Sequence, residues 1–207
     1  MLSACYPYET VGTIQVCLKK NYNDGKTTVC TPDTTNTYYQ SGAPVQITNV
    51  QEGAAGADKF YVDMTFESKS NGEIYSAIRG QQCESQNIAD DTYNKNQLWI
   101  QIDARGNAQT VSCTPLQPGF GGTGHPYDST FTTDNPQSSL LTGAAIRVLP
   151  QHNAEGVLRM TDGKAQMRCY FTAPSNVQDA VGTISVSARY YVKDVVSSPL
   201  TVSHTSG

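Results

Sequence analysis

The sequence predicts an all-β protein, an antiparallel β-sandwich with a disulfide-bonded β-hairpin at its N-terminus. Short runs of alternating apolar and polar residues recur along the chain between turn-forming residues. Charged residues make up only 15% of the chain, and Thr, Ser and Tyr, which suit strands, replace them. The six cysteines form an even set without a CxxC spacing. No segment shows the periodicity of an amphipathic helix.

The N-terminal hairpin is predicted over residues 13–31. Its turn contains Asp-Gly at positions 24–25, where glycine adopts a positive φ without steric cost. With a loop over 22–25, counting outward along both strands places Cys17 opposite Cys30. Facing residues bring their Cβ atoms to about 4.5–5.5 Å, near the range of a disulfide. We therefore expect Cys17 and Cys30 to be bonded.

The domain boundary is expected after the Thr-, Asn- and Gly-rich stretch at residues 31–43, which is typical of a loop or linker. A chain of 207 residues is long enough for one or two domains of the usual ~100–200 residues. The predicted organisation is a cysteine-rich N-terminal hairpin and linker over residues 1–43, followed by a β-sandwich domain over residues 44–207.

The strands of the sandwich follow in order, to a total of about nine or ten. They are expected at residues 45–50, 59–67, 72–78, 98–103, 109–113, 157–160, 165–171, 183–192 and 200–202. In 59–67 and 183–192 every second residue is apolar, which is typical of strands with one buried and one solvated face. The Asp-Gly at 162–163 predicts that 157–160 and 165–171 form a hairpin.

Two long loops interrupt these strands, at residues 81–95, which contain Cys83, and at residues 117–138, which are rich in Gly, Pro, Thr and Ser. Long loops are uncommon inside compact domains and often carry function. Residues 140–149 fit either a strand or a short helix.

The candidate ligand-binding residues are three aromatic side chains. By the alternation of its strand Trp99 falls on the polar face, and Phe120 and Tyr127 lie in the 117–138 loop. Exposed aromatic rings stack on sugars or anchor a partner protein. The competing interpretation is strand propensity together with packing beneath the N-terminal hairpin.

No motif predicts catalysis, a metal site or a cofactor, so we expect that the protein is not an enzyme. The histidines, at positions 125, 152 and 204, lack any metal-ligand spacing. The sequence holds no G-x-S-x-G nucleophile elbow, and its cysteines fit no zinc site. A secreted hydrolase, the third candidate function, would need two facing carboxylates in a cleft.

Charge and cysteine content restrict the partners and the compartment. The net charge of −4, without any Lys/Arg cluster, argues against nucleic acid. No apolar run is long enough to span a membrane, and none follows Met1 as a signal sequence would. Paired cysteines indicate an oxidising compartment, whereas free buried thiols are the alternative. We expect an extracellular or cell-surface protein whose signal or membrane anchor precedes Met1.

Several stretches also carry a family resemblance. They are CYPYE at 5–9, VC at 16–17 and 29–30, GAPVQITNV at 42–50, NGEIY at 71–75, GVLRMTDGKAQMRCYF at 156–171 and VSARYYVKDVVSSPLTV at 186–202. Together they resemble uncharacterised, membrane-anchored envelope proteins of small-genome archaea with immunoglobulin-like surface domains. The resemblance implies an N-terminal anchor and no catalytic residues. It also implies that Cys113 bonds to Cys169 on a neighbouring strand, with Cys5–Cys83 as the remaining pair.

The expected function is that of an extracellular structural or assembly module of a cell surface or filament. Its partners would be further copies of itself or other surface proteins, because the edge strands of sandwiches accept strands from neighbours. Residues 1–12 or 195–207 are the expected strand donors. The alternative function is a carbohydrate- or ligand-binding β-sandwich domain with glycans as partners.

Overall fold

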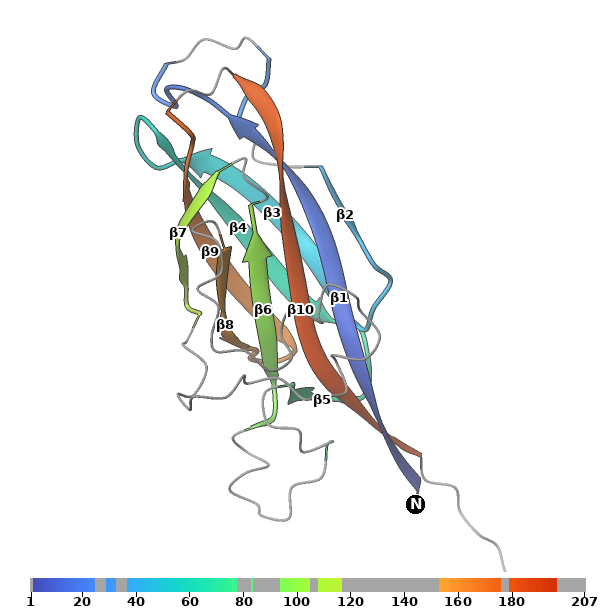
Figure 1. Ribbon diagram of the computed structural model, residues 1–207. Helices are drawn as coiled ribbons and strands as arrows, with labels where there is room; N and C mark the ends of the chain where they lie inside the picture. The colour runs from blue at the N-terminus through green and yellow to red at the C-terminus, as the bar shows by residue number, and fades with distance from the viewer. Residues whose placement is uncertain are drawn as a thin grey trace, which may run out of the picture.

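The fold is seen in a computed structural model, which describes residues 2–24, 29–32, 37–77, 83, 94–104, 108–116, 153–175 and 179–196. The named elements of this part of the chain are all β-strands (Figure 1). They are β1 (Leu2–Leu18), β2 (Tyr38–Gln40), β3 (Val45–Ala54), β4 (Lys59–Ser68), β5 (Glu73–Ser76), β6 (Gln97–Asp103), β7 (Gln109–Thr114), β8 (Asn153–Arg159), β9 (Lys164–Thr172) and β10 (Ala180–Val196).

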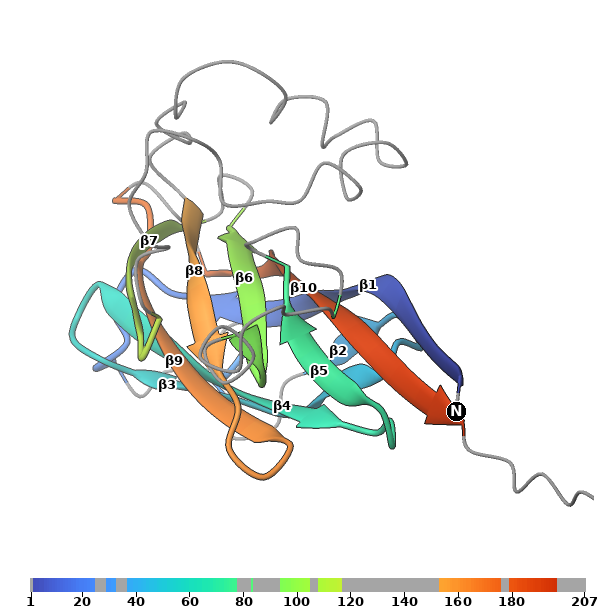
Figure 2. The same ribbon diagram turned by 90° about the horizontal axis from the view of Figure 1, so that it is seen from below.

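Two antiparallel sheets face each other as a β-sandwich, which confirms the predicted fold class (Figure 2). The larger sheet has the order β2-β1-β10-β6-β8, and β5 also pairs with β10. The smaller sheet has the order β3-β4-β9-β7. Most predicted strands are present with slightly different bounds, whereas the strand expected at 200–202 lies outside the described residues.

β1 and β10 form the spine of the larger sheet. They pair antiparallel over their full lengths, from Leu2 opposite Val196 to Leu18 opposite Ala180. In Figure 1 both strands run the length of the molecule, and residues 2–4 with residues 194–196 extend as a two-stranded arm beyond the other strands. β1 therefore belongs to the sandwich, whereas the sequence led us to expect a separate N-terminal unit over residues 1–43.

The core lies between the sheets and follows the period of the strands. The inward residues of β4 are those predicted by alternation, Phe60, Val62, Met64 and Phe66, all at most 1% exposed. On β10 the inward row runs at every second position from Ile184 to Val192, as the sequence predicts. Aromatic rings fill the middle of the core, where the Phe60 and Phe171 rings stack with centroids 5.1 Å apart.

The predicted hairpin at residues 157–171 is wrong in its pairing, although its turn is present. Asp162 and Gly163 have φ of 51° and 72°, and the backbones of Thr161 and Lys164 bond to each other on either side of them. Beyond this turn the strands part, because β8 pairs with β6 in the larger sheet and β9 pairs with β4 and β7 in the smaller one. The turn therefore connects the two layers.

The N-terminal hairpin also differs from the prediction. Asn21 begins a tight turn as expected, since its side-chain oxygen accepts the N–H of Asn23 at 3.0 Å. However, residues 29–32 lie outside the named strands, and β1 takes β10 and β2 as its partners. The predicted Cys17–Cys30 bond is present, but it fastens a loop to β1 rather than joining two facing strands.

All six cysteines are paired, as Cys5–Cys83, Cys17–Cys30 and Cys113–Cys169, which confirms the three expected bonds. Cys113 and Cys169 sit opposite each other on the neighbouring strands β7 and β9. Three disulfides indicate an oxidising environment such as the extracellular space. In the described ranges, no helix has the length and hydropathy to cross a membrane.

Two polar contacts, one part-buried and one buried, fix one sheet against the other along the β1–β2 side. The Gln40 amide, at the end of β2 and within the stretch expected to be a linker, pairs with the backbone of Ile47 on β3, donating to its oxygen at 2.9 Å and accepting from its nitrogen at 2.6 Å. The Gln40 side chain thus makes with the edge of β3 the two hydrogen bonds that a neighbouring strand would make. The Glu52 carboxylate accepts the backbone N–H of Cys17 at 3.0 Å, which covers the edge of β1 near its end.

Candidate functional site

Of the three aromatic residues expected to bind a ligand, only Trp99 lies within the described residues, and it is buried. Trp99 lies on the face of β6 opposite the main core, as alternation predicts, but it is only 2% exposed. It packs with Ala77 and Val157 in a small second cluster on that face. The prediction of an exposed Trp99 is therefore wrong, because alternation gives the face of a strand and not what covers it. Phe120 and Tyr127 lie outside the described residues.

The described part of the chain shows no cluster of side chains that could hold a metal ion, because no three His, Cys, Asp or Glu side chains in it lie close enough together. The predicted loop at 117–138 and the three histidines lie outside the described residues, and so does the ambiguous segment at 140–149. The described residues present two surfaces instead, an open strand edge and a polar pocket.

The first surface is the outer edge of β1 from Ser3 to Glu9. In an antiparallel strand the N–H and C=O of alternate residues point to opposite sides. Val11 accepts a bond from Ser41 on the side away from β10, and the N–H of Gln15 bonds to Thr37 on that same side. The odd-numbered residues of β1 therefore direct their backbone groups away from β10.

β2 covers only part of this edge, because it pairs with β1 from Gly12 to Ile14. Among the described residues no backbone group bonds to the outward N–H and C=O groups between Ser3 and Glu9. Pro7 occupies one of the outward positions, so its missing N–H faces away from β10. Prolines in sheets are found at such edge positions, where they interrupt no ladder hydrogen bond.

The N-terminal half of β1 is itself held in the sheet. Residues 2–12 pair with β10 along their whole length, and Val195 and Val196 pair with them from β10. The prediction that residues 1–12 act as a free strand donor is therefore wrong, because β10 already occupies their inner side. Residues 197–207 lie outside the described part of the chain.

The Cys5–Cys83 disulfide braces the arm. Cys5 packs against a cluster of Tyr75, Cys83 and Tyr191 on the outer side of the larger sheet. Lys193 of β10 donates through its Nζ to the backbone oxygen of Cys83 at 3.2 Å. The open edge of β1 is therefore presented on a cross-linked strand.

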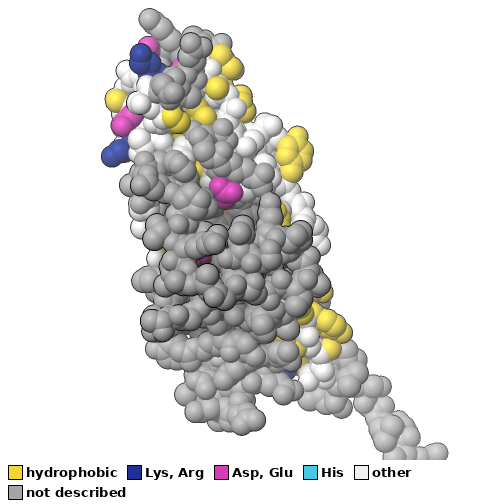
Figure 3. Space-filling view, in the orientation of Figure 1, with side chains coloured by type: hydrophobic (Ala, Val, Ile, Leu, Met, Phe, Trp, Pro, Cys, Tyr) yellow, Lys and Arg dark blue, Asp and Glu magenta, His cyan; other side chains and the backbone are white. Residues whose placement is uncertain are grey.

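Exposed apolar side chains accompany this part of the fold. Tyr6 on β1 and Val195 on β10 are each 48% exposed, and Tyr39 of β2 is 66% exposed. In the space-filling view the described surface on this side shows separate apolar patches rather than one continuous patch (Figure 3). Small apolar patches around a strand edge are compatible with a protein–protein contact.

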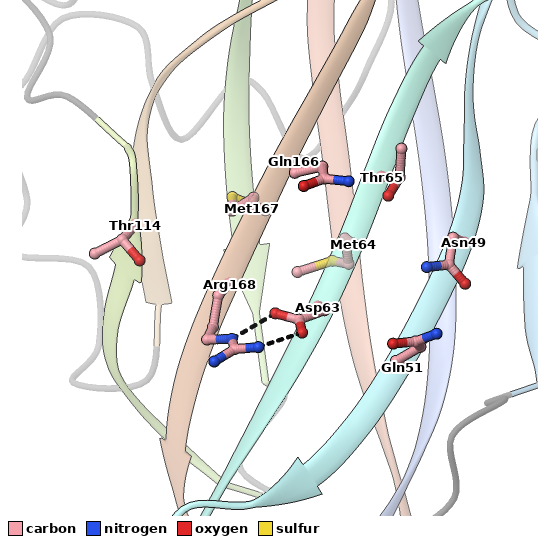
Figure 4. A pocket seen from close by; sticks show the side chains of 9 residues that line it. All are labelled: Asn49, Gln51, Asp63, Met64, Thr65, Thr114, Gln166, Met167 and Arg168. Carbon is pink, nitrogen blue, oxygen red and sulfur yellow. Dashed lines mark hydrogen bonds and ion pairs between the residues drawn. The ribbon is translucent and has the colours of Figure 1, made fainter.

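The second surface is a polar pocket of about 330 Å³ on the outer face of the smaller sheet (Figure 4). All four strands of that sheet contribute to it, with Asn49 and Gln51 from β3 at one side and Thr114 from β7 at the other. Gln166 and Arg168 of β9 and Asp63 and Thr65 of β4 line its centre. The pocket faces away from the core and the larger sheet.

An ion pair fixes the floor of this pocket. The Arg168 guanidinium donates to both Asp63 oxygens, from Nε to Oδ1 and from Nη2 to Oδ2, each at 2.6 Å. The guanidinium also lies 4.1 Å from the centre of the Tyr61 ring, and the Tyr61 ring in turn packs against the Tyr170 ring with centroids 6.3 Å apart. The bonds to Asp63 and then to Tyr170 raise the pKa of Arg168 further above its ordinary value. The pair is therefore held in one geometry with its charges balanced.

A β-bulge places the β3 side of the pocket. Ile47 pairs with Phe66 and Asn49 with Thr65, so Thr48 is an extra residue without an opposite partner. After this shift Val50 and Glu52 point inward, and Asn49 and Gln51 join the outer face beside Asp63. The sequence predicts Asp63 and Thr65 on the outer face of their strand, but the order β3-β4-β9-β7 that assembles the pocket is a long-range property.

Comparison of the chain with protein-family models, with curated proteins and with solved structures gives no match. The function is therefore argued from these two surfaces.

Proposed function

We propose that the protein is an extracellular structural or assembly module, which joins further copies of itself through the outer edge of β1. The observation that carries the proposal is the run of outward backbone groups from Ser3 to Glu9 that no described strand covers. An edge of this kind is a template for another strand. The three disulfides support a place outside the cytoplasm.

A second copy of the same strand is the partner that fits this edge. Closed two-fold dimers are the commonest symmetric assemblies, and they bring identical surfaces together. In an antiparallel contact between two copies, Ser3 of one copy lies opposite Cys5 of the other. The outward N–H and C=O groups of Ser3 and Cys5 in both copies then bond to each other. In this register Pro7 lies outside the bonded stretch, so its lack of an N–H removes no hydrogen bond between the two copies. The exposed Tyr6 side chain adds apolar contact area beside the joined strands.

The experiment compares two substitutions at one position. Ser3→Pro removes an outward N–H and leaves the bonds to β10, which involve the even-numbered residues, whereas Ser3→Ala keeps every backbone group. We expect light scattering over a range of concentrations to show self-association for the unaltered chain and Ser3→Ala, and monomers for Ser3→Pro. Electron microscopy of the native material would then show joined particles. A chain that stays monomeric throughout, or a Ser3→Pro variant that associates as the unaltered chain does, would contradict the proposal.

A further inference from the structure

Several polar side chains that line the pocket on the smaller sheet are exposed and have no hydrogen-bond partner within the described part of the protein. Among the described residues, the side chains of Asn49, Gln51, Thr65 and Gln166 make no hydrogen bond within the protein. Elsewhere along the sheet edges, amides such as that of Gln40 are used in pairs with the backbone. The pocket amides are therefore available to a bound molecule.

The charge of the pocket indicates a neutral ligand. Of the described residues that line it, only Asp63 and Arg168 carry charge, and they neutralise each other through two hydrogen bonds. An anionic ligand would lie beside the Asp63 carboxylate unless it displaced that group from the guanidinium, and a cationic ligand would lie beside the guanidinium unless it displaced Arg168. Breaking such a bidentate pair is unfavourable, since charge-assisted hydrogen bonds are about twice as strong as neutral ones.

The donors and acceptors of the pocket further restrict the chemical class of the ligand. Each amide side chain offers two donors and an acceptor with two lone pairs, and threonine offers one donor and two lone pairs. Hydroxyl groups match this mixture because each hydroxyl also donates and accepts. The Tyr61 ring packs on the Arg168 guanidinium and against the Tyr170 ring, and rings of this kind give apolar contact area with a polar tip, although neither ring lines the pocket itself. The volume of about 330 Å³ lies at the small end of ligand pockets.

We infer that this pocket binds a neutral, hydroxyl-rich carbohydrate. The Asn49 and Gln51 amides on one side and the Gln166 amide on the other would pair with ring hydroxyls, while the Asp63–Arg168 pair positions the floor and offers its remaining donors and lone pairs. The site is separate from the β1 edge, since it lies on the opposite sheet and on that sheet's outer face. It is also separate from Trp99, which is buried on the other sheet.

The test uses the whole chain on an array of immobilised neutral oligosaccharides built from glucose, mannose, galactose and N-acetylglucosamine, with sialylated and sulfated oligosaccharides on the same surface. We expect binding to a subset of the neutral oligosaccharides and none to the anionic ones. Calorimetric titration of the best binder then compares Gln51→Ala and Gln166→Ala with Gln101→Ala, a matched amide substitution on β6 of the other sheet.

Each pocket substitution should weaken binding about three- to tenfold, the size expected for one lost neutral hydrogen bond. Gln101→Ala should bind as the unaltered chain does, and circular dichroism should show the same fold for all variants. Gln51→Glu provides a second check, because it keeps the size of the side chain and adds an unbalanced charge that should also weaken binding. No binding to any neutral oligosaccharide, preference for the anionic ones, or equal loss in Gln101→Ala would overturn the inference. Because Ser3→Pro leaves this pocket untouched, failure of either proposal is recognised independently of the other.

Discussion

The hydroxyl of Tyr190 and the backbone of Val45 join the two sheets. The N–H of Val45 on β3 donates to Tyr190 Oη on β10 at 2.8 Å, and Thr10 Oγ1 on β1 donates to the oxygen of Val45 at 2.6 Å. Because that bond uses the Thr10 hydrogen, Tyr190 donates to Thr10 Oγ1 over the 3.1 Å between them. All three residues are at most 1% exposed, so this network satisfies its buried polar groups completely.

Tyr190→Phe should therefore destabilise the protein by about 1–3 kcal/mol, because it leaves the buried N–H of Val45 without an acceptor. Tyr6→Phe is the control, since Tyr6 is 48% exposed and its substitution should change stability by less than about 0.5 kcal/mol. Urea unfolding followed by circular dichroism measures both. Equal unfolding midpoints for the two variants would show that the network contributes nothing.

Buried tyrosines should make the fold sensitive to alkali. Burial raises the pKa of Tyr190, and burial together with the charge of Glu52 raises the pKa of Tyr22. Above pH about 10, tyrosines of the unfolded chain lose their protons while these two keep theirs, so unfolding is favoured as the pH rises. Each such group should lower the unfolding free energy by about 1 kcal/mol between pH 10 and 11, and the slope approaches about 1.4 kcal/mol per pH unit at higher pH. Unfolding titrations between pH 9 and 11 should show a shallower decline for Tyr22→Phe than for the unaltered chain, and identical slopes would contradict this account.

The disulfides should differ in their contribution to stability. Cys113–Cys169 closes a separation of 56 residues, whereas Cys17–Cys30 closes 13. If the bonds act by restricting the unfolded chain, the longer loop should stabilise the fold by about 1 kcal/mol more. Replacing each pair by alanines and measuring thermal unfolding tests this order. A larger loss for the Cys17–Cys30 pair would contradict it.

Gly12 marks a close approach of the two sheets. A Cβ at this position would lie 2.6 Å from Cδ1 of Ile47, whose side chain is fixed in the core. Gly12→Ala should therefore cost about 1–3 kcal/mol through overpacking. Gly42→Ala is the matched control, because its Cβ would meet no atom within 4 Å, and it should be neutral or slightly stabilising. Similar unfolding free energies for the two variants would show that Ile47 moves aside without cost.

Local patterns predict the strands well and their partners poorly. The alternation from Phe60 to Phe66 depends only on neighbouring residues, so it identifies β4 and its buried face correctly. The partner of β1 is β10, which lies near the other end of the described chain, and no local pattern encodes that pairing. For the same reason Asp-Gly at 162–163 predicts a turn correctly but does not show that the strands on either side enter different sheets.

At the candidate sites, too, local patterns predict correctly and long-range contacts are missed. Counting along an assumed hairpin finds the correct partner for Cys17, although the strand assumed for Cys30 is absent from residues 29–32. Trp99 is assigned to the correct face but is buried by neighbours that are distant in sequence, such as Val157. The polar pocket needs the β3 bulge at Thr48 and the adjacency of β4 and β9, and both depend on register rather than on composition.

The meeting of Leu2 and Val196 at one end of the spine has a mechanical consequence. A pulling force applied between these two residues would break the hydrogen-bonded pairs of β1 and β10 one after another from this end. It would not load all of the pairs in shear at the same time. Such peeling needs little force until it reaches Cys5, where the bond to Cys83 ties β1 covalently to another part of the chain. The arm would thus yield over its first few residues and then resist further extension as long as that bond stays oxidised.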